Sequence, residues 1–325
     1  MFNNKTILIT GGTGTFGVHF LNYIINNKIN FKKIIIFSRD EFKQFNLQNT
    51  FDKKILNKLR FFLGDIRDKE RLKSAFRDVD IIIHAAALKQ VPAAEYNPVE
   101  FIKTNILGAQ NIVEAAIESN VKKIISLSTD KACSPINLYG ATKLCSDKLF
   151  VSANNIKGRN KISFSLVRYG NVFGSRGSVF NEFEKQKKNK LIKITHKDMT
   201  RFNIFIEDAI KMVLWSCKHS VGGEIVVPKL KSFKVVDLAK LIAPKIKHKI
   251  IGTRLGEKIH ESLISIGDGR NVVDVGKYYI VSQSQKVRNY YKNKFSSKIK
   301  NFTQEYSSAD NLMNLKELSK ILKIK

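Results

Sequence analysis

The chain has 325 residues, 43% of them hydrophobic, and a formal net charge of +29. Its length is enough to bury a large core, and the absence of any run of about 18 apolar residues predicts no membrane span. The sequence runs at once into an apolar segment, so no signal peptide is expected. Three cysteines without metal-binding spacing predict no metal site and favour a reducing cytoplasm.

The positive charge comes mostly from lysines spread through the whole chain. Clustering is modest and is strongest near the C-terminus, in residues 292–300 and 320–325. Dedicated nucleic-acid-binding proteins usually gather such charge on one face or helix. We therefore expect no specific nucleic-acid partner, although the charge alone predicts weak, salt-sensitive binding to polyanions.

The first motif is an apolar segment, residues 6–10, that ends in the glycine-rich run of residues 11–17 (GGTGTFG). Apolar residues at helical spacing follow, from Phe20 to Ile25. Strand, glycine turn and helix in this order are typical of a dinucleotide-binding site, because small residues let the backbone approach a pyrophosphate at the helix N-terminus. Alone, the motif fits an ordinary glycine-rich turn equally well.

Residues 33–37 predict a second parallel strand, apolar on both faces. An acid at the tip of this strand often binds the ribose 2′-hydroxyl of NAD. Here the tip is Ser38-Arg39-Asp40, with Lys43 nearby. Arg39 and Lys43 can neutralise a 2′-phosphate, which favours NADP, whereas Asp40 is the opposing signal.

A third strand with its turn is predicted over residues 59–66, and a fourth strand over residues 79–87. Asp65 lies at the end of the third strand and can meet an adenine amino group. The fourth opens into Ala85-Ala86-Ala87, small residues that let the backbone lie against the cofactor's ribose. We expect His84 to be packed at the strand end and Asn105, inside a helix predicted over residues 97–119, to make a buried structural hydrogen bond.

A sixth strand is predicted over residues 162–168, and the fifth, residues 121–127, leads into Ser128-Thr129-Asp130-Lys131. Tyr139 and Lys143 follow on one face of the next helix. An ammonium beside a phenol lowers the pKa of the phenol, so that it can accept a proton from a sugar hydroxyl. Asp130 and Lys131 are either a solvated charge run or, at the tip of a central strand, a catalytic pair. Lysine works as a base only when its pKa is depressed, which we expect from burial and from Lys143 as a second cation.

These motifs resemble those of the extended short-chain dehydrogenase/reductases. More closely, the chain resembles the 5-inverting UDP-N-acetylglucosamine 4,6-dehydratases that open pseudaminic acid synthesis for flagellin glycosylation. The resemblance covers about residues 5–285 and is carried by stretches 10–17, 38–44, 64–72, 84–98, 103–111, 127–155, 168–179, 199–202, 222–229 and 248–261.

The resemblance implies an α/β fold, with a Rossmann-like doubly wound parallel sheet and a smaller α/β substrate-binding lobe. The NADP-binding domain is expected over residues 1–172, with 204–225 packing back onto it. A discontinuous UDP-sugar-binding lobe is expected over 173–203 and 226–325, of which 286–325 form a basic C-terminal tail. The tail is expected to be an exposed amphipathic helix or an oligomer contact, in a cytoplasmic homo-oligomer, dimer or hexamer.

The resemblance also implies a mechanism. Tyr139 takes the C4 hydroxyl proton while hydride passes to a tightly bound NADP that is recycled within each turnover. Lys131 removes the C5 proton, and Asp130 gives a proton to the leaving C6 hydroxyl. Hydride returns to C6, C5 is reprotonated on the opposite face, and Thr129 hydrogen-bonds the substrate or Tyr139. Retaining relatives carry Asp-Glu in place of Asp130-Lys131, so Lys131 is the basis for predicting inversion.

Binding residues are implied in the same way. For the cofactor they are Gly11, Thr13, Gly14, Thr15, Phe16, Gly17, Ser38, Arg39, Asp40, Lys43, Asp65, Ile66, Ala85, Ala86, Ala87, Lys89, Tyr139, Lys143 and Val172. For UDP-N-acetylglucosamine they are Lys89, Asn171, Arg176, Gly177, Ser178, Val179, Thr195, Arg201, Arg254 and Glu257. The arginines are expected on the diphosphate, because guanidinium binds phosphate bidentately, with a surface ion pair as the alternative for each.

Alternatives stay open. The chain departs from the family at Gln90, Asn203 and Leu255, which flank the predicted substrate site and put the identity of the sugar in question. A related inverting dehydratase for capsule or O-antigen sugars, one that also epimerises further, is the runner-up. A C4 epimerase would leave Asp130 and Lys131 idle. A catalytically silent NADP-binding regulator predicts a broken acid/base pair, and the pair is intact.

Overall fold

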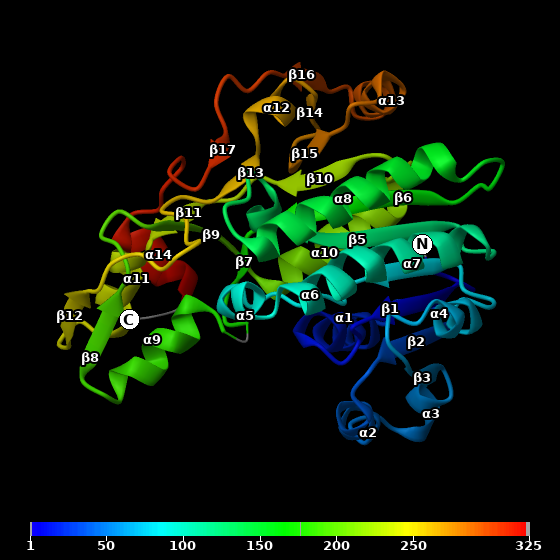
Figure 1. Ribbon diagram of the computed structural model, residues 1–325, viewed down its shortest axis with the longest axis horizontal. Coiled ribbons are helices and arrows are strands. Elements are labelled where there is room, and N and C mark those ends of the chain that lie inside the picture. The colour runs from blue at the N-terminus through cyan, green and yellow to red at the C-terminus, as the bar shows by residue number, and fades with distance from the viewer. Residues whose placement is uncertain (1, 176, 323–325) are drawn as a thin grey trace.

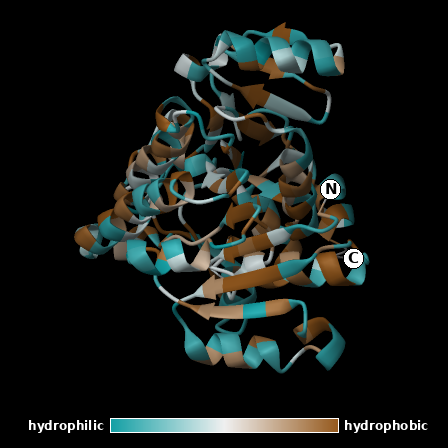
Figure 2. Ribbon diagram, turned by 90° about the vertical axis from the view of Figure 1, so that its right-hand side faces the viewer, coloured by the Kyte–Doolittle hydropathy of each residue, from teal (hydrophilic) through white to brown (hydrophobic). Residues whose placement is uncertain are grey.

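A computed structural model describes residues 2–175 and 177–322 of the chain. Its centre is a ten-stranded sheet with helices on both faces, and a smaller lobe stands beside it (Figure 1). Hydrophobic residues concentrate on the strands and hydrophilic residues on the outer sides of the helices (Figure 2). The predicted Rossmann-like α/β class is confirmed.

Six parallel strands form the predicted part of the sheet, in the order β6-β5-β4-β1-β2-β3. Residues of β1 and β6 are buried throughout, as expected for strands covered on both faces. The order reverses between β1 and β4, and ligands bind at the carboxyl ends of strands beside such a reversal. The bounds are β1 Thr6–Thr10, β2 Lys33–Ser38, β3 Leu59–Leu63, β4 Ile81–His84, β5 Lys123–Thr129 and β6 Ser163–Tyr169.

Helices cover the two faces of the sheet with separate apolar cores. One face is covered by α1 and α10, which bury residues such as Phe20 and Met212. The other is covered by α4, α7 and α8, which bury Leu72, Ile112 and Phe150. The bounds are α1 Thr15–Asn26, α2 Glu41–Gln48, α3 Lys53–Leu56, α4 Lys69–Ala75, α5 Val91–Tyr96, α6 Pro98–Phe101, α7 Gly108–Ile117, α8 Leu138–Ile156 and α10 Ile206–His219.

The helix predicted over residues 97–119 is not continuous. It consists of α6, a π-helical segment η1 (Ile102–Leu107) and α7. Asn105 explains the interruption: its side chain accepts a hydrogen bond from the Leu88 amide at 2.9 Å and donates to the Leu88 carbonyl at 2.9 Å and to Thr142 Oγ1 at 3.0 Å. The buried structural hydrogen bond expected for Asn105 is confirmed, and it ties the loop after β4 to α8.

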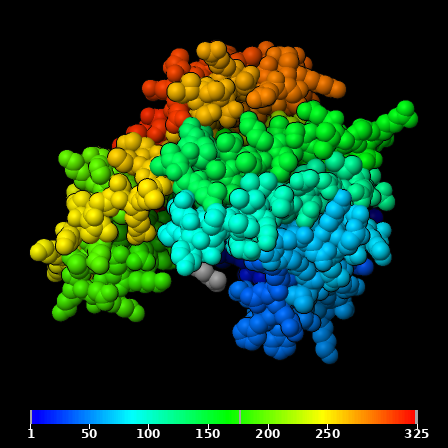
Figure 3. All heavy atoms as spheres, in the orientation of Figure 1, coloured from blue at the N-terminus to red at the C-terminus, as the bar shows by residue number. Residues whose placement is uncertain are grey.

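The smaller lobe has its own apolar core, built from residues such as Phe183, Ile192 and Leu238. Figure 3 shows it in green and yellow beside the sheet domain, with the surface notched between the two. Its elements are α9 Val179–Lys187, β8 Leu191–Ile194, β9 Thr200–Ile204, β11 Ser232–Lys234, α11 Val235–Ile242, β12 Lys247–Ile250 and α14 Leu315–Leu322; β7 (Asn171–Val172) pairs with β9.

Part of the segment predicted to join the lobe belongs to the sheet instead. The expectation for residues 226–325 is wrong there, because the buried run of β15 (Tyr278–Val281) pairs antiparallel with β10 (Ile225–Pro228). Two more antiparallel strands, β14 (Val272–Asp274) and β16 (Lys298–Lys300), follow at that edge, near α12 (Ile266–Gly269) and α13 (Gln285–Phe295).

The C-terminal tail, expected to be exposed or an oligomer contact, crosses back from this edge to the lobe. Its strand β17 (Tyr306–Ser307) pairs with β13 (Ser262–Ile264), and α14 buries Leu318 in the lobe core. The three cysteines form no disulfide, and within the described residues no helix is long and apolar enough to cross a membrane.

Candidate active site

A cavity of about 580 Å³ lies between the carboxyl ends of the parallel strands and the lobe. The glycine turn after β1, the tip of β5, the start of α8 and the first residues of α9 all line it. Two loops that are distant in sequence, after β4 and before β13, complete its wall. The topology therefore brings the motifs of the first half of the chain to one side of the cavity and those of the second half to the other.

The glycine turn has the geometry that a pyrophosphate requires. Gly11 has a φ of +66°, and a Cβ on it would lie 2.9 Å from the Ala86 Cα, so a side chain is excluded there. Gly14 caps α1 without a side-chain hydrogen bond, which leaves the first N–H groups of the helix available to an anion. A Cβ on Gly17 would lie 2.4 Å from the Gly12 carbonyl, so this glycine lets the helix pack on the turn. The residues present fit a dinucleotide.

The predicted cofactor residues divide into two groups. Those that line the cavity are Gly11, Gly14, Thr15, Phe16, Ala85, Ala87, Lys89, Tyr139, Lys143 and Val172. The others do not line it and lie in the glycine turn, in the first turns of α1 and α2, or at the ends of β2, β3 and β4: Thr13, Gly17, Ser38, Arg39, Asp40, Lys43, Asp65, Ile66 and Ala86.

The Asp40 carboxylate makes its contacts with the first turn of α2, the helix that follows it. Its carboxylate accepts a hydrogen bond from the Lys43 amide at 2.9 Å as the N-cap of α2, and it also pairs with the Lys43 ammonium. These contacts with Lys43 lower the pKa of Asp40. Arg39 is half-exposed and lies 3.5 Å from Asp65, whose main partner is Arg67 at 2.8 Å. Burial tends to raise the pKa of Asp65, but the hydrogen bonds from Arg67 outweigh it and lower that pKa.

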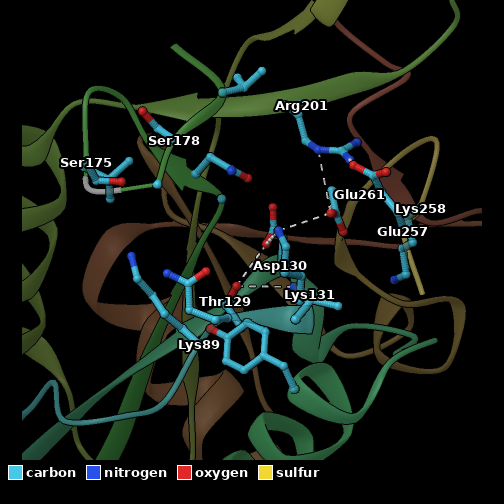
Figure 4. Close-up of a pocket in the computed structure, with 18 of the residues that line it drawn as sticks. Lys89, Thr129, Asp130, Lys131, Ser175, Ser178, Arg201, Glu257, Lys258 and Glu261 are labelled. Carbon is cyan, nitrogen blue, oxygen red and sulfur yellow. Dashed lines mark hydrogen bonds and ion pairs between the residues drawn. The ribbon is translucent and has the colours of Figure 1, made fainter. Parts of the chain in front are cut away.

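The acid/base cluster stands at the tip of β5 (Figure 4). Asp130 is 1% exposed, and its Oδ1 accepts from Thr129 Oγ1 at 2.9 Å and from Lys131 Nζ at 3.2 Å. Its other oxygen, Oδ2, is buried without a hydrogen-bond partner among the described residues. A short 3₁₀ turn, η2 (Asp130–Ala132), turns both side chains of the pair into the cavity.

Glu261 completes this cluster and was not predicted. It precedes β13, is 2% exposed, and its Oε1 lies 3.1 Å from Lys131 Nζ and 3.9 Å from Arg201 Nε. The stretch 248–261 belongs to the sequence resemblance and ends at this residue, but nothing in the sequence connects it with Lys131. Only the tertiary fold brings the two side chains together.

The expectation of a depressed lysine pKa is wrong for this structure. Burial tends to lower the pKa of Lys131, but the carboxylates of Asp130 and Glu261 outweigh it and raise that pKa well above its usual value. Burial and the charge of Glu261 raise the pKa of Asp130, against the opposing effect of Lys131. The neighbouring cation is Arg201 rather than Lys143. These shifts favour the ammonium form of Lys131 and the neutral form of Asp130.

Tyr139 and Lys143 line the cavity together, but the ammonium does not act on the phenol as expected. Burial raises the pKa of Tyr139 to about 12, and the groups that oppose this rise are Lys131 and a hydrogen bond with Thr129. Lys143 Nζ donates to the Leu127 carbonyl at 2.9 Å, and burial lowers its pKa. Thr129 thus contacts Tyr139, one of the two roles predicted for it.

His84 is packed, as expected, and takes no part in the site. Its Nδ1 lies 2.8 Å from Thr10 Oγ1, its ring lies 5.3 Å from that of Phe150, and burial lowers its pKa to about 3. Among the described residues, no three His, Cys, Asp or Glu side chains are grouped so as to hold a metal ion.

The predicted substrate residues converge on the lobe side of the cavity. Lys89, Asn171, Gly177, Ser178, Val179, Thr195, Arg201, Arg254 and Glu257 all line it, whereas Arg176 lies outside the described residues. The Asn171 Oδ1 is buried without a hydrogen-bond partner in the described part of the chain, so it can accept a bond from a ligand. Of the three departures, Gln90 and Leu255 line the cavity and Asn203 does not.

Arg201 is held in place by contacts within the protein. It donates to the carbonyls of Thr200 at 2.7 Å and Ile259 at 3.2 Å, and its guanidinium lies 3.7 Å from Glu257 Oε1. Arg254 sits on a tight turn that Glu257 closes by accepting from the Arg254 amide at 3.2 Å. This turn is anchored to the start of α8, because Asn137 Nδ2 donates to the Gly256 carbonyl at 2.8 Å.

Comparison with known proteins agrees with this arrangement. A family profile described as "Polysaccharide biosynthesis protein" matches residues 7–283. The UDP-N-acetylglucosamine 4,6-dehydratase (inverting) of Campylobacter jejuni subsp. jejuni serotype O:23/36 (strain 81-176) is 55% identical over 290 residues, which are 88% of this chain and 85% of the relative. The resemblance inferred from the motifs is thereby confirmed.

Two further similarities cover the whole chain. A UDP-glucose 4-epimerase of Rickettsia bellii (strain OSU 85-389) is 41% identical over 330 residues, 98% of this chain and 96% of that protein. The X-ray structure of Pen from Bacillus thuringiensis has a TM-score of 0.90 and 35% sequence identity, and covers 99% of this chain and 98% of its own. The lobe and the tail are therefore shared with relatives as well as the sheet.

Proposed function

The chain belongs to the polysaccharide biosynthesis protein family, and from this membership and the chemistry of its cavity we propose that it is a UDP-N-acetylglucosamine 4,6-dehydratase that inverts C5. The product is UDP-2-acetamido-2,6-dideoxy-β-L-arabino-hex-4-ulose. The observation that carries the proposal is the acid/base pair Asp130-Lys131 in one cavity with Tyr139 and Lys143. A 4-epimerase needs only the tyrosine and lysine of the second pair.

The residues of this chain divide the proton transfers between them. Tyr139 takes the proton of the C4 hydroxyl as C4 is oxidised to a ketone, and for this its phenol, which burial keeps neutral, must first lose its own proton to solvent. The ketone acidifies the proton on C5, and Lys131 removes that proton. Because the Glu261 carboxylate holds Lys131 as an ammonium, Lys131 must first give its own proton to solvent before it can take one from C5. Asp130 gives its proton to the C6 oxygen, and water leaves.

The cofactor that we propose is NADP, held tightly along the glycine turn. When bound, it supplies the hydride acceptor for C4 and the hydride donor for C6. The preference over NAD is supported by Asp40, because a carboxylate that caps α2 and pairs with Lys43 is less available to a ribose hydroxyl. Arg39 remains half-exposed beside it and can meet a 2′-phosphate.

The substrate is held by the lobe. We assign the UDP-sugar to the wall formed by Asn171, Ser178, Thr195 and the turn at Arg254, with residues 1–172 and 204–225 as the cofactor domain. The protein would act in the cytoplasm as a homo-oligomer, at the first step of pseudaminic acid synthesis or of a related surface sugar.

The deciding experiment is to incubate the protein with UDP-N-acetylglucosamine and NADP in deuterated water and to follow the product by NMR. We expect a 4-keto-6-deoxy sugar of L-arabino configuration with deuterium at C5. The variant Lys131→Ala should lose the deuterium incorporation, because no other group in the cluster is expected to exchange that proton. Incorporation at the wild-type rate in this variant would mean that Lys131 is not the group that acts at C5.

The second candidate is a C4 epimerase, which the 41% identity to the Rickettsia bellii protein favours. The same NMR experiment separates the two. An epimerase yields the C4 epimer with the C6 hydroxyl retained and no deuterium at C5, and that result would exclude the dehydratase.

A further inference from the structure

One lysine ammonium in the cavity faces two buried carboxyl groups. Lys131 Nζ lies 3.2 Å from Asp130 Oδ1 and 3.1 Å from Glu261 Oε1. The second oxygen of each group, Asp130 Oδ2 and Glu261 Oε2, is buried without a partner among the described residues. One ammonium shared by two buried carboxyl groups cannot compensate both negative charges, so the carboxyl group that lacks a further cation nearby is expected to be protonated.

The surrounding charges decide which group keeps the proton. Glu261 faces Lys131, Arg201 and Lys258, three cations from three different segments. Among the described residues, the cation beside Asp130 is Lys131, and its other ionisable neighbours are Glu261 and Tyr139. Glu261 is accordingly the better-compensated carboxylate, and Asp130 is the group that stays neutral.

We propose that Glu261 is a positioning residue of the active site, which takes the Lys131 ammonium as its ion-pair partner and so leaves the Asp130 carboxyl in its neutral, proton-donating form. Glu261 takes no part in the bond changes. The Asp130 O–H proton goes to the C6 oxygen, the C6–O bond breaks, and water leaves. Without Glu261, Asp130 would pair with Lys131 as a carboxylate and would have no proton to give.

The backbone around Glu261 is held for this task by the C-terminal tail. The Glu261 amide donates to Ser308 Oγ at 2.8 Å, and the Ser308 amide donates to the Glu261 carbonyl at 2.7 Å. Ser308 Oγ also lies 2.7 Å from Thr200 Oγ1, next to Arg201. Ser308 thus fixes the Glu261 backbone through both its amide and its carbonyl, which holds the side chain in register with Lys131.

The inference rests on the proposed function for its catalytic meaning, but its central claim is about protonation and can be measured without turnover. The C=O stretching band of a protonated Asp130 is isolated as the infrared difference between a protein and the same protein carrying Asp130→Asn. Glu224, another buried carboxyl group with a raised pKa, is common to both and cancels. We expect the Asp130 band in the wild-type protein at neutral pH.

In Glu261→Gln, which keeps the shape and removes the charge, the pH at which this band disappears should fall by at least about 1 unit. Glu261→Met, an apolar replacement of similar length, should give the same shift if the glutamine variant does not fold. Glu305→Gln is the matched control, because Glu305 accepts hydrogen bonds from Ser134 and Ser262 instead, and it should leave the band unchanged. An unchanged midpoint in both Glu261 variants overturns the proposal.

Kinetic measurements then test whether Glu261 supports acid catalysis by Asp130. Acid catalysis by a positioned group is worth roughly 100-fold or more, so Glu261→Gln should lower kcat for loss of water by about that factor. A 6-deoxy-6-fluoro analogue of the substrate loses fluoride, which needs less help from an acid, and its elimination should fall far less. Equal losses for both leaving groups contradict the assignment. A wild-type protein that dehydrates neither substrate refutes the proposed function, while the infrared result still decides the role of Glu261.

Discussion

At the scale of single residues, the cluster at the tip of β5 behaves differently from what its sequence suggests. The order Asp130-Lys131 predicts an acid beside a base, and both side chains do line the cavity. The protonation states, however, depend on Glu261, a residue far away in the sequence that lies 3.1 Å from the Lys131 ammonium. A local motif identifies which groups transfer protons, and the tertiary contacts determine which of them holds a proton at the start.

The predicted preference for NADP depends on the side chain of Arg39. Arg39→Ala removes the half-exposed guanidinium at the tip of β2 and should weaken NADP binding by about 10-fold or more, because one charged contact with a phosphate is worth roughly 1.5–3 kcal/mol. NAD binding should change little. Both affinities can be measured by calorimetry on one preparation. Equal losses of affinity for the two dinucleotides would show that Arg39 does not select NADP over NAD.

At the scale of elements, the six parallel strands were predictable because each is a short, nearly continuous apolar run. Residues 6–10 match β1, and the strand and turn predicted over residues 59–66 contain β3. The antiparallel edge strands β14 and β16 were not predicted, since they have three residues each and carry no periodic pattern that distinguishes them from loops. The π-helical segment was missed for a related reason: apolar residues at Ile102 and Ile106 fit an ordinary helix, and only the tertiary bonds of Asn105 show the change in hydrogen bonding.

The π-helical segment η1 gives a prediction about the loop that follows β4. Asn105→Ala leaves the Leu88 amide and carbonyl without their side-chain partner, and each unpaired buried group costs about 1–3 kcal/mol. We expect a loss of roughly 3 kcal/mol in the free energy of unfolding, measured with urea, together with a higher KM, because the loop carries Lys89 into the cavity.

Thr104→Val is the control for this change. Thr104 is the neighbour of Asn105 in the same segment, and its buried hydroxyl has no hydrogen-bond partner among the described residues. Replacing it by a side chain of the same shape should be close to neutral. If both variants lose the same stability, the effect belongs to the segment as a whole and not to the contact between Asn105 and Leu88.

At the scale of the whole molecule, the last 30 residues connect parts that the cavity must hold together. The tail begins at the edge of the large sheet with β16, passes Glu261 through Ser308, and ends with α14 on the lobe. The sequence indicated a basic amphipathic helix here but not what it packs against, because its lysines dominate the composition while Leu318 alone is fully buried. The tail therefore contacts both Glu261, which lines the cavity, and the core of the lobe.

Leu318→Ala tests whether the tail holds the lobe in position. Leu318 is 0% exposed in the lobe core, and truncating such a leucine costs about 2–5 kcal/mol. Because its neighbours form the wall assigned to the UDP-sugar and not the glycine turn, KM for the sugar nucleotide should rise while the affinity for the dinucleotide stays the same. Ile321→Ala, on the same helix but 37% exposed, should cost about 1 kcal/mol or less. If Leu318→Ala also lowers the affinity for the dinucleotide, the tail stabilises the sheet domain and the lobe as one unit. A change in the lobe core would then also alter the dinucleotide side of the cavity.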